Sequence, residues 1–172
     1  MFPEISKILY ATDLTPNSAY VFRYAMDTAK KHDARIVILH VIEPLSPMSE
    51  MLIASHLPKD KRDAILRERI HYAMEQIRQR LKNFIQKEVG GEFEPDTRVE
   101  KIDVCQGFAV EEILKKSGEY GCDLIVMGTH GKGVIKNTFL GSTARRLLRR
   151  VRKPVYIVPL PEEGEEVVFN SI

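Results

Sequence analysis

The chain has 172 residues, of which 44% are hydrophobic and 29% are charged, and its formal net charge is +2. This length is typical of one domain, or of one domain with an insertion, and it suffices for a substantial core. The small net charge, and the lack of aromatic residues among the arginines of residues 145–152, argue against a nucleic-acid-binding protein. No apolar run is long enough to cross a membrane, the first residues do not read as a signal peptide, and Cys105 and Cys122 lack metal-ligand spacing. We therefore expect a cytoplasmic protein.

Five short apolar runs alternate with longer segments of helical periodicity. The runs predict strands at Ile5–Thr12, Ala34–Ile42, Arg98–Val104, Cys122–Gly128 and Pro154–Leu160. The periodic segments predict helices at Asn17–His32, Lys59–Val89, Ala109–Glu119 and Ser142–Val151, with Thr15 as the candidate cap of the first. Charges interrupt the third run, as is typical of an edge strand. The alternation predicts one doubly wound α/β domain, a five-stranded parallel sheet with helices on both faces.

Two segments differ in composition from the domain of residues 1–160. Residues 43–57 form an irregular, proline-containing insertion after the second predicted strand, and they act as a lid, a partner contact or a disordered crossover. Residues 161–172 contain four glutamates and no basic residue, which predicts an acidic C-terminal tail. This tail either lies across a partner subunit or forms a frayed terminus.

A spaced glycine motif follows the fourth predicted strand. The pattern is G-x2-G-x9-G-S-T, formed by Gly128, Gly131, Gly141, Ser142 and Thr143. Glycines after a buried strand let backbone N–H groups approach an anion, and the hydroxyls and a helix N-terminus add further donors. The P-loop pattern is absent, and Lys136 occupies the third glycine position of a dinucleotide fingerprint. The motif therefore predicts that nucleotide phosphates bind at the carboxyl end of a parallel strand.

The motif resembles that of the universal stress protein family, in its nucleotide-binding branch. ATP-binding members of that family carry G-x2-G-x9-G-[S/T], which this chain matches in full. Three further segments fit the family: the first strand ending in Ala11-Thr12-Asp13, the His40-Val41 pair, and Lys153-Pro154-Val155 before the last strand. The resemblance covers about residues 5–160. It implies a fold like that of the adenine nucleotide alpha hydrolases and an ATP or AMP ligand, with Mg²⁺ or Mn²⁺ held mainly by phosphate oxygens and water.

The predicted binding site lies at the carboxyl ends of the strands, where the strand order of such a sheet reverses. It comprises Ala11, Thr12, Asp13, Val41, Met127, Gly128, His130, Gly131, Gly141, Ser142 and Thr143. Asp13 either accepts hydrogen bonds from the nucleoside, as the resemblance implies, or caps a turn. The resemblance also places backbone groups of Val41 against the adenine edge. His130 either contacts phosphate or is an ordinary loop residue.

These observations favour a regulatory stress-response protein that binds an adenine nucleotide and acts as a dimeric switch. The resemblance implies a homodimer joined through the strand at residues 154–160. One alternative is an enzyme, either a slow ATPase or a protein that phosphorylates itself at Ser142 or Thr143. Another is a dimeric interaction protein that has lost nucleotide binding. No catalytic triad, carboxylate pair or metal-binding helix can be identified from the spacing, so no catalytic residue is assigned.

Overall fold

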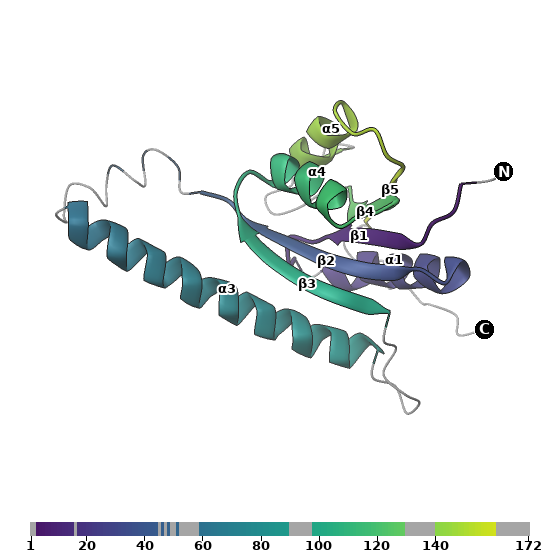
Figure 1. Ribbon diagram of the computed structural model, residues 1–172, viewed down its shortest axis with the longest axis horizontal. Coiled ribbons are helices and arrows are strands. Elements are labelled where there is room, and N and C mark those ends of the chain that lie inside the picture. Colours follow the sequence, from purple (N-terminus) through teal and green to yellow (C-terminus); the bar gives the residue numbers. More distant parts are fainter. Residues whose placement is uncertain are drawn as a thin grey trace.

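The computed structural model describes residues 3–15, 17–44, 46, 48, 51, 59–89, 98–129 and 140–160, with the side chains of residues 59–66, 69 and 89 left aside. Its elements are β1 (Lys7–Ala11), α1 (Ser18–His32), β2 (Arg35–Ile42), α3 (Lys59–Val89), β3 (Val99–Gln106), α4 (Ala109–Glu119), β4 (Leu124–Gly128), α5 (Ser142–Leu148) and β5 (Val155–Val158). Figure 1 shows these elements as one sheet flanked by helices. None of the helices among these residues is both long and apolar enough to cross a membrane.

The sheet contains five parallel strands in the order β3-β2-β1-β4-β5. The chain first moves outward from β1 to β2 and β3, and it then returns to place β4 on the other side of β1. The strand order therefore reverses between β1 and β4, where Leu9 lies opposite Ile125 and Tyr10 opposite Val126. In open parallel sheets, ligands bind outside the carboxyl ends of the strands at such a reversal. The predicted fold class is confirmed.

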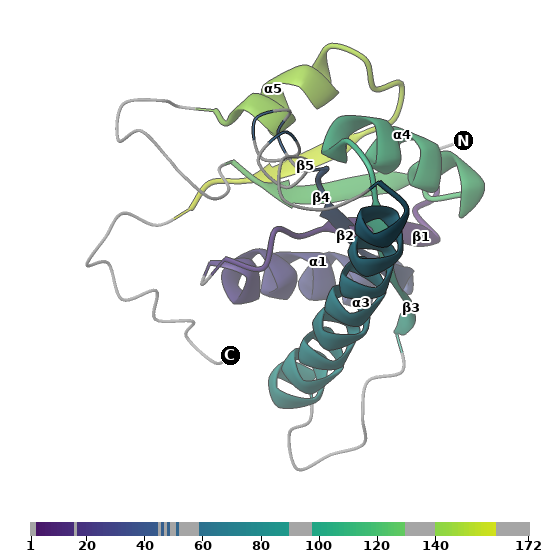
Figure 2. The ribbon, with the colours of Figure 1, turned by 90° about the vertical axis from the view of Figure 1, so that its left-hand side faces the viewer.

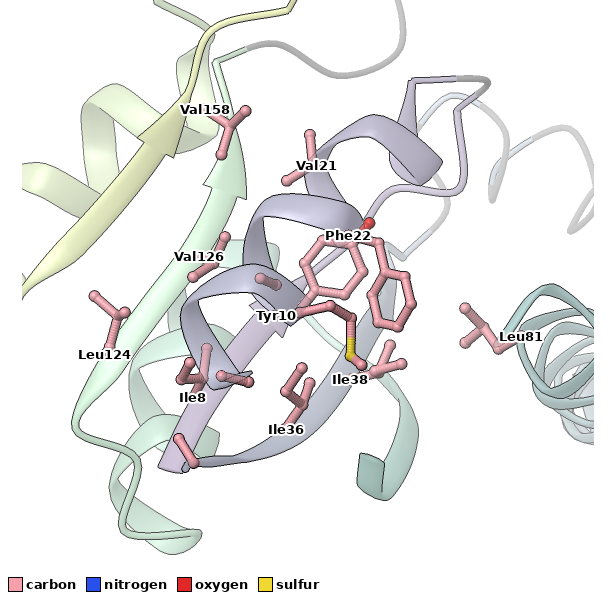
Figure 3. Packing of buried hydrophobic residues seen from close by; sticks show 14 of the residues in the cluster. Ile8, Tyr10, Val21, Phe22, Ile36, Ile38, Leu81, Leu124, Val126 and Val158 are labelled. Atoms are coloured by element: carbon pink, nitrogen blue, oxygen red, sulfur yellow. The ribbon is translucent and has the colours of Figure 1, made fainter. Parts of the chain in front are cut away.

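Helices α1 and α3 cover one face of the sheet, and α4 and α5 cover the other (Figure 2). Because successive strand residues point to opposite faces, Ile8 and Tyr10 join the first core while Leu9 joins the second. Figure 3 shows the first core, in which the rings of Tyr10 and Phe22 lie 5.5 Å apart between their centroids. Full burial of a side chain such as Phe22 contributes about 1.5–3 kcal/mol. Both faces of the central strands are thus apolar, as their continuous hydrophobic runs predict.

The sequence located the strands β1–β5 and the helices α1, α3, α4 and α5, and four details needed correction. Met48 and Met51 are helical, although they fall in the segment 43–57 that was predicted to be irregular. Helix α5 ends at Leu148 and not at Val151, because the N–H groups of Arg150 and Val151 both bond to the carbonyl of Leu147 in a closing turn. Strand β3 continues to Gln106, and it is an edge strand as predicted. The cap of α1 is Asn17, without a side-chain cap bond, so the prediction of Thr15 was wrong.

Several predicted features lie outside the described residues. They are His130, Gly131 and the rest of the segment 130–139, the acidic tail 161–172, and most of the insertion 43–57. Within the insertion, Met48 and Met51 are described and exposed. Helix α3, which follows the insertion, packs Leu81 against the first core (Figure 3). Its amino-terminal part extends beyond the sheet (Figure 1).

Candidate functional site

A pocket opens at the carboxyl ends of β1 and β4, where the strand order reverses. It holds about 210 Å³ of empty space, including the part that opens to solvent. Among the described residues it is lined by Tyr10, Ala11, Thr12, Asp13, Thr15, Asn17, Ser18, Val21, Gly128 and Leu160. Four of the predicted site residues, Ala11, Thr12, Asp13 and Gly128, therefore meet in one pocket although they come from two strands.

The turn after β1 contains Asp13, and only one of its two carboxylate oxygens has a hydrogen-bond partner among the described residues. Asp13 Oδ1 accepts hydrogen bonds from the backbone N–H and the hydroxyl of Thr15, at 3.1 and 2.9 Å. Asp13 Oδ2 is buried and has no hydrogen-bond partner within the described part of the chain. Between these two residues Leu14 adopts a φ of 61°, a left-handed conformation that costs a side-chain-bearing residue about 1–2 kcal/mol. A buried carboxylate oxygen without a donor is costly, so the turn is built to receive one.

Thr12, at the start of this turn, makes hydrogen bonds through its N–H, its hydroxyl and its carbonyl. Its N–H donates to the carbonyl of Leu39 at 2.9 Å, and its hydroxyl lies 3.0 Å from that of Ser18. Its carbonyl lies 2.8 Å from Nδ1 of His40, and because a carbonyl only accepts, this ring nitrogen carries the proton. The buried histidine of β2 thus acts as a hydrogen-bond donor within the fold.

Tyr10 forms the floor of the pocket. Its hydroxyl donates to the carbonyl of Ser18 at 2.7 Å, which ties β1 to the first turn of α1. Burial is the main cause that raises the pKa of Tyr10 well above its ordinary value, so the phenol remains protonated and keeps this bond at any physiological pH. Tyr10 therefore shapes the pocket without acting as an acid or a base.

The wall formed by β4 is joined to the start of α5. The N–H of Gly141 donates to the carbonyl of Thr129 at 2.8 Å, which brings the third glycine of the motif beside the end of β4. Gly141 is also the N-cap residue of α5, and no side chain caps this helix end. Ser142 and Thr143 are its first two residues. The motif residues on either side of segment 130–139 are thus held together by a backbone bond.

The other predicted residues that the structure describes lie at the same end of the sheet but do not line the pocket. Val41 stands near the end of β2, opposite Cys105, and packs with Met127 in the core beneath α4 and α5. Sequence reasoning missed Thr129, Leu160 and the polar residues Asn17 and Ser18. The polar run Thr15–Ser18, directly after the acidic turn, was an available signal for Asn17 and Ser18, whereas nothing local pointed to Leu160.

No group of three or more His, Cys, Asp or Glu side chains that could hold a metal ion occurs among the described residues. The two cysteines are not activated nucleophiles, because burial raises the pKa of both Cys105 and Cys122 to about 11. The arrangement suits the binding of a neutral or donor-rich small molecule at Asp13.

The fold and the pocket define a class: a doubly wound parallel α/β domain with a pocket at the reversal of strand order. The chain belongs to the universal stress protein family, whose model matches residues 4–159. Universal stress protein MJ0577 of Methanocaldococcus jannaschii is 28% identical over 164 residues, which cover 88% of this chain and 93% of that protein. Universal stress protein A of Salmonella typhi is 29% identical, with 92% and 96% covered.

Solved structures show the same fold. The structure of MJ0577 superposes with a TM-score of 0.69 at 24% identity, covering 92% of this chain and 99% of that one. The universal stress protein UspA of Lactobacillus plantarum gives a TM-score of 0.62 at 18% identity, with 93% and 100% covered. A universal stress protein solved in complex with cAMP gives 0.56 at 19% identity, with 92% and 100% covered.

Proposed function

We propose that this protein binds an adenine nucleotide, ATP or AMP, in the pocket between the carboxyl ends of β1 and β4. The observation that carries the proposal is Asp13, which lines that pocket and whose buried Oδ2 has no hydrogen-bond partner among the described residues. Ribose hydroxyls and the adenine amino group are the hydrogen-bond donors of a nucleotide, and a carboxylate accepts from either. The cAMP complex of a family member, which holds an adenine nucleotide, supports the same class of ligand.

The phosphates in this proposal lie toward the glycine motif. Gly128 borders the pocket, and the bond from Gly141 to Thr129 holds the other end of the motif next to it. The hydroxyls of Ser142 and Thr143 are available as donors at the start of α5. We include Val41 and Met127 in the proposed site because they lie at this end of the sheet, and His130 and Gly131 on the strength of the sequence motif alone. A Mg²⁺ or Mn²⁺ ion would be held by phosphate oxygens and water, with Asp13 as the nearby carboxylate.

The proposed role is a regulatory switch in the cytoplasm, formed by a homodimer that pairs through β5. Strand β5 is one edge of the sheet, it carries no charged residue, and Tyr156 is 37% exposed. The opposite edge, β3, carries exposed Glu100 and Lys101 and packs against α3. Charges protect an edge strand from pairing with another chain, and their absence from β5 favours pairing there.

Replacing Asp13 by asparagine tests the nucleotide site. In Asp13→Asn the amide oxygen still accepts from Thr15, whereas an NH₂ group replaces Oδ2 and meets the ligand's donor. We expect the affinity for ATP and AMP, measured by calorimetric titration, to fall at least tenfold, or by about 1.4 kcal/mol. The matched control is Asp27→Asn on the exposed side of α1, where the carboxylate contacts only Lys31 in the described chain. Equal affinities of wild type and Asp13→Asn would reject this site.

A charge placed in each edge strand tests the dimer. We expect light scattering at micromolar concentration to find a dimer for the wild type. Ile157→Lys in β5 should shift the protein toward monomer, because a lysine amine at the interface loses its hydration. Ile102→Lys in β3 is the matched control, since both isoleucines are half-buried in edge strands. A folded Ile157→Lys protein that remains dimeric would place the interface elsewhere.

A further inference from the structure

Thr129, which directly follows β4, connects the end of β4 with the start of α5 and with the end of β5. Its N–H donates to the carbonyl of Val158 at the end of β5, at 3.0 Å. Its carbonyl accepts from the N–H of Gly141 at 2.8 Å. Its hydroxyl oxygen accepts from the N–H of Leu160 at 3.3 Å. The side chain is 7% exposed, which makes Thr129 one of the few polar residues inside the described core.

Two of these bonds reach the walls of the proposed site. Leu160 and Gly128 both line the pocket, and the hydroxyl of Thr129 fixes the backbone of Leu160 beside that glycine. The backbone bond to Gly141 fixes the point at which the glycine motif returns to α5. The third bond joins both walls to the end of the edge strand β5. A displacement of any one of these segments is therefore transmitted to the other two.

We propose that Thr129 is the positioning residue of the nucleotide site and that its hydroxyl holds the Leu160 wall in the binding geometry. This inference rests on the proposed function. A purely structural role would require only a side chain of this shape, which valine also has. The hydroxyl adds an acceptor for one backbone N–H, and that N–H belongs to a residue of the pocket. In this proposal, nucleotide affinity depends on the position of the hydroxyl acceptor and not on the volume of the side chain.

The matched substitutions Thr129→Val and Thr129→Ser separate these two roles. Valine keeps the shape and loses the acceptor, whereas serine keeps the acceptor and loses a methyl group. We expect the affinity for ATP and for adenosine to fall about three- to tenfold in Thr129→Val and to stay within about twofold of wild type in Thr129→Ser. Both ligands should lose affinity equally, because Leu160 borders the pocket of Asp13, where the nucleoside is proposed to bind. If the valine variant does not fold, Thr129→Ala removes the same acceptor.

Amide hydrogen exchange of Leu160, followed by NMR in the full chain, supplies a second measurement. Exchange at this amide should accelerate in Thr129→Val and remain slow in Thr129→Ser, and ATP should slow it further in the wild type. Accelerated exchange together with unchanged affinity in the valine variant would overturn the positioning role. A wild-type protein that binds neither ATP nor adenosine would instead remove the proposed function, and the role of Thr129 with it.

Discussion

The two ends of the β1–β4 pair each carry an aspartate, and the surroundings of these two residues differ sharply. At the amino end, Asp123 Oδ2 accepts three hydrogen bonds, from the N–H and the hydroxyl of Ser6 and from the N–H of Lys7, at 2.9, 2.8 and 3.0 Å. At the carboxyl end, Asp13 Oδ2 has no partner within the described chain. One carboxylate oxygen thus accepts three hydrogen bonds at one end of the strands, whereas one buried carboxylate oxygen at the other end accepts none from the described residues.

The residues around the two aspartates differ in the same way: those near Asp123 make further hydrogen bonds, whereas the backbone next to Asp13 is strained. Near Asp123, the amine of Lys153 donates to the carbonyls of Ser117 and Cys122 at 2.9 and 2.6 Å, which joins the end of α4 to the start of β5. Near Asp13, Leu14 is held in a left-handed conformation. Unsatisfied polar atoms and backbone strain gather where a fold has a function to perform. We infer that the amino end supports stability, and we propose that the carboxyl end binds the ligand.

The same substitution at the two aspartates should give the largest contrast. Asp123→Asn replaces a charged acceptor of three hydrogen bonds by a neutral one, and we expect the free energy of unfolding at pH 7 to fall by about 1–2 kcal/mol. Asp13→Asn removes a buried charge at Oδ2 and weakens only the two hydrogen bonds from Thr15 to Oδ1, so it should lower the stability of the ligand-free protein by less than Asp123→Asn does. Urea unfolding measures both values.

Nucleotide affinity should show the reverse order. Asp123→Asn is expected to bind ATP as tightly as the wild type, because its side chain lies at the opposite end of the strands from the pocket. A loss of ATP affinity in folded Asp123→Asn would show that the two ends are coupled. A loss of stability in Asp13→Asn as large as that in Asp123→Asn would remove the distinction between them.

The fold was predictable because its signals are local. The run Leu124–Met127 is continuously apolar, as a strand buried on both faces must be, and the spacing of Met74, Ile77, Leu81 and Phe84 repeats with the helical period. Asp13 and Gly128 were placed correctly at one end of the sheet because parallel strands bring their carboxyl ends together. That rule needs only the order of the elements.

The rest of the site depends on contacts that no local pattern encodes. Thr129 bonds to Val158 and Leu160, and Asp123 bonds to Ser6, which is 117 positions away in the chain. The left-handed conformation of Leu14 is also invisible in the sequence, since leucine is a poor choice for it. The cap prediction for Thr15 failed because α1 begins at Ser18 with Asn17 as its N-cap, so that Thr15 lies two residues before the cap position.

The smallest expected effect is a pH dependence of the stability that Asp123 contributes at the amino end of the strands. Burial alone would raise the pKa of Asp123, but the hydrogen bonds from Ser6 and from the N–H of Lys7 outweigh it and lower the pKa below the ordinary value of 3.8. A carboxyl whose pKa is lower in the folded state stabilises the fold above its unfolded pKa, and this contribution is lost as the pH falls through the folded pKa. The stability difference between wild type and Asp123→Asn should therefore be constant from about pH 7 to pH 5 and narrow below about pH 4. Urea unfolding across this range measures it.

Ser6→Ala, which removes one of the three donors to Asp123, is the control. In the Ser6→Ala background, the stability difference caused by Asp123→Asn should change less with pH. A difference that keeps its full size down to about pH 3 would mean that the hydrogen bonds to Asp123 do not depend on its charge.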